Sequence, residues 1–379
     1  MSVYAKRIGI VSLEHKKFEH LSEIAFENLY NAIGNNTGNL MFTNAVFEQI
    51  DADLFQVDFS FNPEKINKEF DVLVIPAANW INDYYDWAWF IDLLEKVAIP
   101  IITIGIGLQA TSSDIDKARI SESSLRLIKL LSERSKWISC RGDFTQEWMA
   151  SIGIKNTVTT GCPSLYMKLG GQCVSEVDDG EVILQGTRYW ASNEFNLSEN
   201  INRKIYAMAG QLNLPMIYQS EAEEIDYLLN SKSRRDQYAS NNKEALANLY
   251  GFTNFEDVIK YIDSKGNVFF DIKKWSEYVK QSAGVIGTRL HGAILALNSG
   301  KPARLVAHDS RTQEMANFAE IPTISEGAIS DLNESDMRKI LNDTDLSKYI
   351  TRRKFNSKIY IQFLEDCGLR PNFQKVIVE

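Results

Sequence analysis

The chain has 379 residues, 44% of them hydrophobic and 24% charged, and its 41 Lys and Arg against 50 Asp and Glu give a formal charge of −9. This composition is that of a folded globular protein and excludes global disorder. The acidic balance argues against a nucleic-acid partner and a polybasic membrane anchor, and the length fits two domains of roughly 100–200 residues each.

In the first part of the chain, short runs rich in β-branched residues alternate with amphipathic stretches. The runs predict buried strands at residues 7–12, 71–76, 100–105 and 137–140. The stretches between them predict helices at 18–33, 42–50, 87–97 and 121–135. Strands that alternate with helices in this way form parallel sheets built from βαβ units.

A polar, glycine-containing stretch at 170–180 marks the predicted domain boundary, so we expect domains at residues 1–170 and 171–344. The second part predicts strands at 181–185, 214–219, 267–270, 284–287 and 303–307, and helices at 221–230, 243–250, 273–282, 290–298 and 311–319. A helical segment at about 345–379 is expected to pack back on the first domain. The predicted fold class is α/β, with two doubly wound, Rossmann-like domains facing a cleft. In such sheets ligands bind at the carboxyl ends of the strands.

The segment Thr288-Arg289-Leu290-His291-Gly292 follows the predicted strand 284–287 and opens the next helix. Gly300 is the expected left-handed residue after the end of that helix. Arg289 and His291 therefore fall in a first helical turn, where free N–H groups favour an anion. An arginine offers a planar fork for phosphate or carboxylate, and a histidine transfers protons near neutral pH. The pattern predicts an anionic substrate that undergoes proton transfer; the alternative is a structural histidine beside an arginine in a surface ion pair.

This segment and three earlier blocks resemble the polysaccharide pyruvyl transferase family. The blocks stand in family order and are Asn36-Thr37-Gly38-Asn39, Ser139-Cys140-Arg141-Gly142-Asp143-Phe144-Thr145, Thr160-Gly161-Cys162-Pro163-Ser164-Leu165, and Gly287-Thr288-Arg289-Leu290-His291-Gly292-Ala293 followed by Gly300-Lys301-Pro302 and Asp309-Ser310-Arg311.

The resemblance implies a fold similar to GT-B glycosyltransferases and an enzyme that uses phosphoenolpyruvate. Such an enzyme places pyruvate as a ketal on two hydroxyls of a sugar, in a cell-surface polysaccharide or its lipid-linked precursor, and releases phosphate. By match to the family's motif, Arg289 and His291 would bind the donor and drive the proton transfer, and Arg141 would close on the same anion. The helix N-terminus at Leu290 adds N–H donors to this predicted donor site. Domain 1–170 would hold the acceptor and domain 171–344 the donor.

Further candidates follow other predicted strands. Arg188 comes after strand 181–185 and is a candidate donor contact, while Asn39 in the first loop and Asn79 and Trp80 after strand 71–76 are candidate acceptor contacts. At 77–81 the chain departs from the glycine-rich turn of many family members. The aromatic residues from Trp87 onward are interpreted as one packed face of a helix rather than as sugar-stacking surfaces.

Two other polar groups are ambiguous or expected to be exposed. Asp309 and Arg311 form either an ion-paired helix start or a substrate contact, and His15 and His20 are expected at the surface. The four cysteines have no C-x-x-C spacing, and no Asp, Glu or His cluster has metal-ligand spacing. We therefore expect no metal and no cofactor beyond the donor substrate.

Two rival functions remain open at this point: a GT-B glycosyltransferase that uses a nucleotide sugar, and a carbohydrate-binding protein without catalysis. No signal peptide is evident, and the longest apolar run, 98–110, is too short to span a bilayer. We therefore expect a cytoplasmic protein, with transient contact at the membrane's inner face if the acceptor is lipid-linked.

Overall fold

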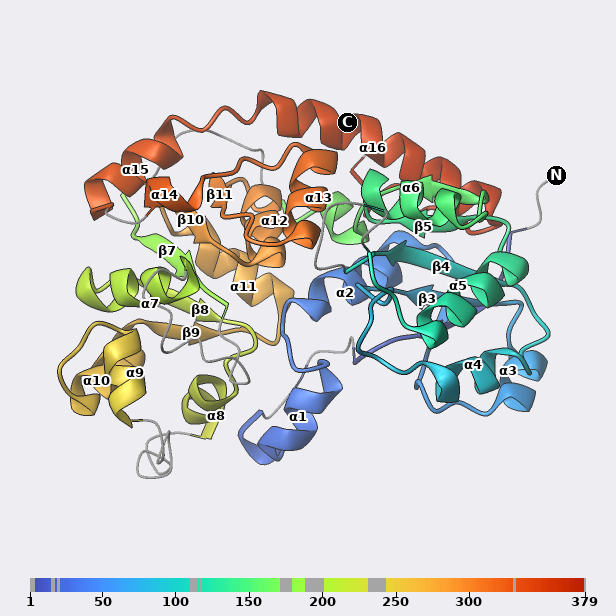
Figure 1. Cartoon of the computed structure of the whole chain (residues 1–379), viewed down its shortest axis with the longest axis horizontal. Coiled ribbons are helices and arrows are strands. Elements are labelled where there is room, and N and C mark those ends of the chain that lie inside the picture. The colour runs from blue at the N-terminus through green and yellow to red at the C-terminus, as the bar shows by residue number, and fades with distance from the viewer. Residues whose placement is uncertain are drawn as a thin grey trace.

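The computed structural model describes residues 4–14, 18, 21–109, 115, 118–170, 179–187, 201–230, 243–329 and 332–377. Within these ranges the strands form two parallel sheets, each flanked by helices (Figure 1). The first sheet has the order β2-β1-β3-β4-β5-β6 and the second the order β11-β10-β7-β8-β9. The predicted α/β fold with two parallel sheets is confirmed.

The strands of the first sheet are β1 (Arg7–Val11), β2 (Asp53–Val57), β3 (Val72–Pro76), β4 (Ile101–Ile106), β5 (Ile138–Cys140) and β6 (Thr157–Thr159). Those of the second are β7 (Val182–Gln185), β8 (Met216–Tyr218), β9 (Gly266–Val268), β10 (Gly284–Gly287) and β11 (Ala303–Leu305).

The helices up to the end of the first sheet are η1 (Leu21–Glu23), α1 (Phe26–Ala32), α2 (Asn39–Gln49), α3 (Pro63–Glu69), α4 (Ala88–Leu94), α5 (Glu122–Arg134), α6 (Asp143–Ser151) and η3 (Pro163–Tyr166). The later helices are α7 (Ile201–Gln211), α8 (Ala222–Asn230), α9 (Lys243–Leu249), α10 (Phe255–Lys265), α11 (Ile272–Lys280), α12 (Leu290–Asn298), α13 (Ser310–Ala319), α14 (Glu326–Ile329), α15 (Glu334–Asn342) and α16 (Ser347–Asp366).

The first sheet is buried on both faces. In β3, Val72 and Val74 belong to one apolar cluster, whereas Leu73 and Ile75 belong to the cluster on the other side. Successive side chains of a strand point to opposite faces of its sheet. A strand covered on both faces therefore reads as a continuous apolar run, which is why the sequence pattern predicts it well.

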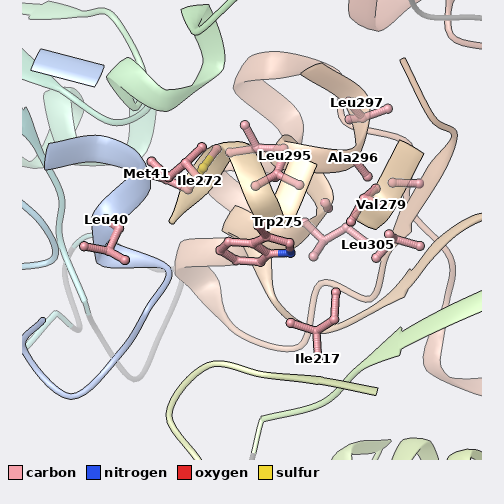
Figure 2. Close-up of a cluster of buried hydrophobic side chains, with 14 of the residues drawn as sticks. Leu40, Met41, Ile217, Ile272, Trp275, Val279, Leu295, Ala296, Leu297 and Leu305 are labelled. Carbon is pink, nitrogen blue, oxygen red and sulfur yellow. The ribbon is translucent and has the colours of Figure 1, made fainter. Parts of the chain in front are cut away.

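One apolar core extends from the first sheet to the second, and α2 lies where they meet. Leu40 and Met41 of this helix belong to the same cluster as Trp275 of α11 and Leu295 of α12, and Figure 2 shows these side chains together. Because α2 is buried on nearly all sides, it has no polar face to signal its start. The sequence prediction accordingly began this helix at residue 42, three residues late.

The C-terminal helix α16 runs along both halves of the molecule (Figure 1). Its Tyr360 stacks on Tyr166 of η3, with ring centroids 4.9 Å apart. After the helix, Gly368 O accepts a hydrogen bond from Ala5 N at 2.9 Å, and Arg370 O accepts one from Asp51 N at 2.8 Å. No helix within the described ranges combines the length and apolarity needed to cross a membrane.

The structure corrects several predicted elements. The helix expected at 18–33 is a short 3-10 turn, η1, followed by α1. Strands β2 and β6 were not predicted, because β2 alternates exposed and half-buried residues at the sheet's edge and β6 is only three residues long. Helices α3, α6, α7, α10, α14 and α15 were likewise not predicted from the sequence.

Candidate active site

The turn between β10 and α12 lies at the carboxyl edge of the second sheet. Gly287, the last residue of β10, approaches β7 so closely that a Cβ there would lie 1.9 Å from the carbonyl oxygen of Gln185. Arg289 is the N-cap residue of α12, but its side chain does not cap the helix. The helix ends before Gly300, which has the left-handed φ of 86° that the sequence predicts.

Arg289 is held by a buried carboxylate. Its Nε donates to Gly186 O at 2.8 Å, and its Nη2 pairs with Glu221 Oε1 and donates to Ser220 Oγ. Glu221, whose side chain is fully buried, also accepts hydrogen bonds from Gln219 N and Ser220 N at 2.8 and 3.0 Å. The sequence analysis predicted Glu221 only as the start of a helix and missed that it pairs with Arg289. The one feature of the sequence that could have indicated this role is an acidic residue shortly after a predicted strand.

Arg141 reaches the same region from the end of β5 in the first sheet. Its Nε donates to Gly105 O at 2.9 Å, its Nη2 to Ala77 O at 3.3 Å and its Nη1 to Asn79 Oδ1 at 3.4 Å. These acceptors hold the guanidinium at the carboxyl ends of β3 and β4, where it is only 4% exposed. An arginine so oriented is a ready binding group for an anion.

His291 stands between the two arginines and a thiol. Its Nε2 lies 3.7 Å from Cys162 Sγ, and its ring centroid lies 5.8 Å from that of Phe42. Burial, with the positive charges of Arg141 and Arg289, lowers the pKa of His291 from 6.5 to about 3, so the imidazole is neutral at pH 7. A negative charge placed beside the two arginines would raise this pKa.

Helix α2 and the loop before it complete this side of the site. The Phe42 ring lies 5.6 Å from Arg141 Cζ as well as against His291. In the loop, Thr37 N donates to Gln219 O at 2.8 Å, and a Cβ at Gly38 would lie 3.2 Å from His291 Nδ1. The same Cβ would lie only 2.7 Å from Gln219 Oε1, so the glycine of the first sequence block lets the loop pack against both Gln219 and His291. The contact of Phe42 was not predicted, because the residue reads as part of an ordinary apolar helix.

Arg141, Arg289, Leu290 and His291 line one cavity of about 380 Å³. The candidate acceptor residues Asn39, Asn79 and Trp80 line it too, together with Phe42, Thr187, Gln219, Thr288, His308 and Arg311. Side chains from the ends of both sheets thus converge on one space. Three arginines make this space cationic in a protein of net charge −9.

Asp309 and Arg311 combine the two roles that the sequence left open. Asp309 caps α13, accepting from Thr312 N at 2.8 Å, and also accepts from Arg311 Nε at 2.9 Å. Arg311 nevertheless lines the cavity and donates through Nη1 to Gln109 Oε1 at 3.3 Å. It is an ion-paired residue at a helix start that also faces the site.

Glu314 of α13 caps a helix of the other sheet. Its carboxylate accepts from Thr145 N at 2.7 Å and from Thr145 Oγ1 at 3.1 Å, at the first turn of α6. The N-cap residue of α6 is Gly142, where a Cβ would lie 2.2 Å from Glu314 Cγ. The glycine after Arg141 in the second sequence block therefore admits this carboxylate. The contact joins the two halves directly beside Arg141.

Some predicted residues lie outside the described ranges: Arg188, His15 and His20. Thr187, which precedes Arg188, does line the cavity. Of the aromatic residues that the sequence assigned to a packed helix face, Trp87 and Phe90 are buried, whereas Trp89 is 43% exposed. Among the described residues, no group of three His, Cys, Asp or Glu side chains is placed to hold a metal ion.

The model of the family described as polysaccharide pyruvyl transferase matches residues 36–310 of the chain. This range contains all of the candidate donor residues: Arg141, Arg188, Arg289, Leu290 and His291. No curated protein matches the sequence.

Three of the solved structures to which the chain is similar are distant from it in sequence. The S. aureus MnaA structure with UDP is 10% identical, with a TM-score of 0.46 over 97% of this chain and 99% of that one. HepE from Anabaena, in complex with UDP and glucose, is 10% identical, with a TM-score of 0.40 over 95% and 97%. The UDP-GlcNAc 2-epimerase from Neisseria meningitidis, bound to UDP-GlcNAc, is 12% identical, with a TM-score of 0.43 over 95% and 99%.

Proposed function

The chain belongs to the polysaccharide pyruvyl transferase family, and we propose that it transfers the pyruvyl group of phosphoenolpyruvate to two hydroxyls of one sugar, forming a ketal and releasing phosphate. The acceptor sugar belongs to a cell-surface polysaccharide, such as a capsule or exopolysaccharide, or to its lipid-linked precursor. The observation that carries the proposal is the convergence of Arg141 and Arg289, from different sheets, on a cavity that also contains His291.

Phosphoenolpyruvate has the charge that this cavity suits. Its phosphate and carboxylate together carry about three negative charges at neutral pH. In the proposed complex Arg141 and Arg289 bind these groups, and the N-terminus of α12 at Leu290 adds backbone N–H donors. Glu221 balances part of the charge of Arg289 and fixes its orientation, so the guanidinium needs little rearrangement when the donor binds.

The proposed reaction conserves every atom of both substrates. One sugar hydroxyl adds to the carbon that bears the phosphate, while the methylene carbon takes a proton from His291 and becomes a methyl group. The second hydroxyl then displaces phosphate from the same carbon, which closes the ketal. Of the two hydroxyl protons, one restores His291 and the other leaves with phosphate.

The acceptor and the cellular location are part of the proposal. Asn39, Asn79 and Trp80 line the same cavity as the two arginines and His291, and in the proposed complex they bind the sugar whose hydroxyls meet the donor. Cys140, Cys162 and Cys367 form no disulfide, which suits a reducing compartment. We therefore place the enzyme in the cytoplasm, in contact with the membrane surface only while it handles a lipid-linked acceptor.

Phosphate release from phosphoenolpyruvate, with galactosyl, glucosyl and mannosyl acceptors, tests the proposal. We expect release by the wild type, a loss of at least about 100-fold in His291→Ala, and a raised KM for phosphoenolpyruvate in Arg289→Ala. Arg126→Ala, an exposed site on α5, is the matched control and should behave as the wild type.

Two results would contradict the proposal. Near-normal turnover by His291→Ala would contradict the role of His291 as the acid that protonates the methylene carbon. A melting temperature raised by a uridine or guanosine nucleotide sugar, but not by phosphoenolpyruvate, would favour the glycosyltransferase alternative.

A further inference from the structure

A second cavity, of about 500 Å³, opens beside the candidate donor site. The two cavities share Asn39, Phe42, Asn79 and Trp80 as a common wall. All the described residues that line the second cavity lie between positions 13 and 89. Its volume is within the range of about 300–1,000 Å³ that is usual for small-molecule sites.

Aromatic rings supported by buried neighbours form the wall of this cavity. Tyr84, Tyr85 and Trp89 are 66%, 42% and 43% exposed, respectively. Beneath them Trp87 is buried; its ring centroid lies 4.4 Å from that of Tyr85 and 4.7 Å from that of Trp80. Trp87 Nε1 also donates to Trp80 O at 2.9 Å. Tyr85 therefore packs on a buried ring, and Trp89 packs on the buried Phe90, with ring centroids 5.4 Å apart. Such packing lowers the entropic cost of binding a ligand.

A second feature of this cavity is that none of its described lining residues is charged. Its polar groups are the amides of Asn39, Asn79 and Asn82 and the tyrosine hydroxyls. Asn82 is occupied in shaping the turn, because its Oδ1 accepts from Tyr85 N at 2.8 Å. A diphosphate would lack a cation here, whereas three arginines line the neighbouring cavity.

We propose that this aromatic groove binds a second, uncharged sugar of the acceptor, so that the substrate is an oligosaccharide of at least two residues. The inference rests on the proposed function for the identity of the reacting sugar. The apolar faces of sugar rings stack on the aromatic rings of the groove, whose polar edges meet the hydroxyls. The sugar to be pyruvylated sits at the common wall, beside Asn79, and its neutral neighbour extends over Tyr85 and Trp89.

The charge pattern selects a glycan over the other ligands that an apolar groove could hold. The anionic donor is drawn to the arginines, and the groove begins where these charges end. A nucleotide or lipid diphosphate in the groove would be desolvated without a paired cation, which is unfavourable. An aliphatic chain could form no hydrogen bond with the amides or the tyrosine hydroxyls of the groove. A neutral saccharide satisfies both the rings and the amides.

The test compares the kcat/KM of disaccharides with that of their methyl monosaccharides. Lactose, cellobiose and mannobiose serve as probes, at saturating phosphoenolpyruvate. We expect a disaccharide to exceed its monosaccharide by at least tenfold, and Trp89→Ala to reduce this ratio at least tenfold, with Tyr85→Ala as a second variant. Phe355→Ala, a 56% exposed ring on α16, is the matched control and should keep the wild-type ratio.

Binding measured without phosphoenolpyruvate separates this inference from the proposed function. Disaccharide titrations followed by tryptophan fluorescence should weaken at least tenfold in Trp89→Ala even if no acceptor releases phosphate. The inference would be overturned if the ratio of the kcat/KM of a disaccharide to that of its monosaccharide were the same in the wild type and in both variants. That result would leave the proposed transfer intact. Tighter binding of a nucleotide sugar than of any neutral disaccharide in the groove would also overturn it.

Discussion

The neutral state of His291 leads to a prediction about proton uptake. In the free protein, burial and the charges of Arg141 and Arg289 lower the pKa of His291 to about 3. To donate a proton at pH 7, the imidazole must gain about four pKa units when the donor binds, or about 5 kcal/mol. One unit charge 4 Å away supplies about 4 kcal/mol at an effective dielectric constant of 20. A donor with about three charges can therefore provide the shift.

The expected sign is uptake, because the pKa of His291 lies below 7 in the free protein and would lie at or above 7 in the complex. Isothermal titration of phosphoenolpyruvate without acceptor, in buffers of different ionisation enthalpy, counts the protons. At pH 7 the wild type should take up close to one proton more than His291→Asn, which corrects for the protons of the ligand itself. Equal proton uptake by the two proteins would refute the reasoning.

Two further predictions concern the close contacts around the site. Gly287→Ala should lower the free energy of unfolding by about 1–3 kcal/mol, because the new Cβ would meet the backbone oxygen of Gln185. The control Gly327→Ala places its Cβ in open space and should change this free energy by less than about 0.5 kcal/mol. Equal urea midpoints for the two variants would contradict the prediction. Glu314→Ala should lower the free energy of unfolding by about 1–2 kcal/mol, because α6 loses its cap. The exposed Glu147→Ala, on the capped helix α6, should cause no change. Unchanged thermal stability in both variants would show that the cap contributes nothing.

The sequence predicted best those features that are local along the chain. The strand 284–287, the helix after it and the left-handed Gly300 all depend on neighbouring residues, and the structure confirms them. The buried strands were recognisable because both of their faces are covered. Edge strand β2 was missed because two of its five residues are exposed and only Val57 is buried, so it lacks the continuous apolar run of the inner strands.

The features that the sequence did not reveal are long-range side-chain contacts. The pair of Arg289 and Glu221 joins residues 68 positions apart, and the cap of Glu314 on Thr145 joins residues 169 positions apart. Nothing near Glu314 in the sequence indicates that its partner is the turn after β5. The low pKa of His291 also depends on Arg141, which comes from the other sheet. Such charges act together only after the two halves have met.

The return of the C-terminal segment to the first sheet affects the order in which the protein can fold during synthesis. The sheet whose strands leave the ribosome first gets its last partners from residues 360–377, which are made after the entire second sheet. Until then Tyr166 lacks the ring of Tyr360, and the backbone N–H groups of Ala5 and Asp51 lack their carbonyl acceptors. The half that is translated first is therefore the half that is completed last.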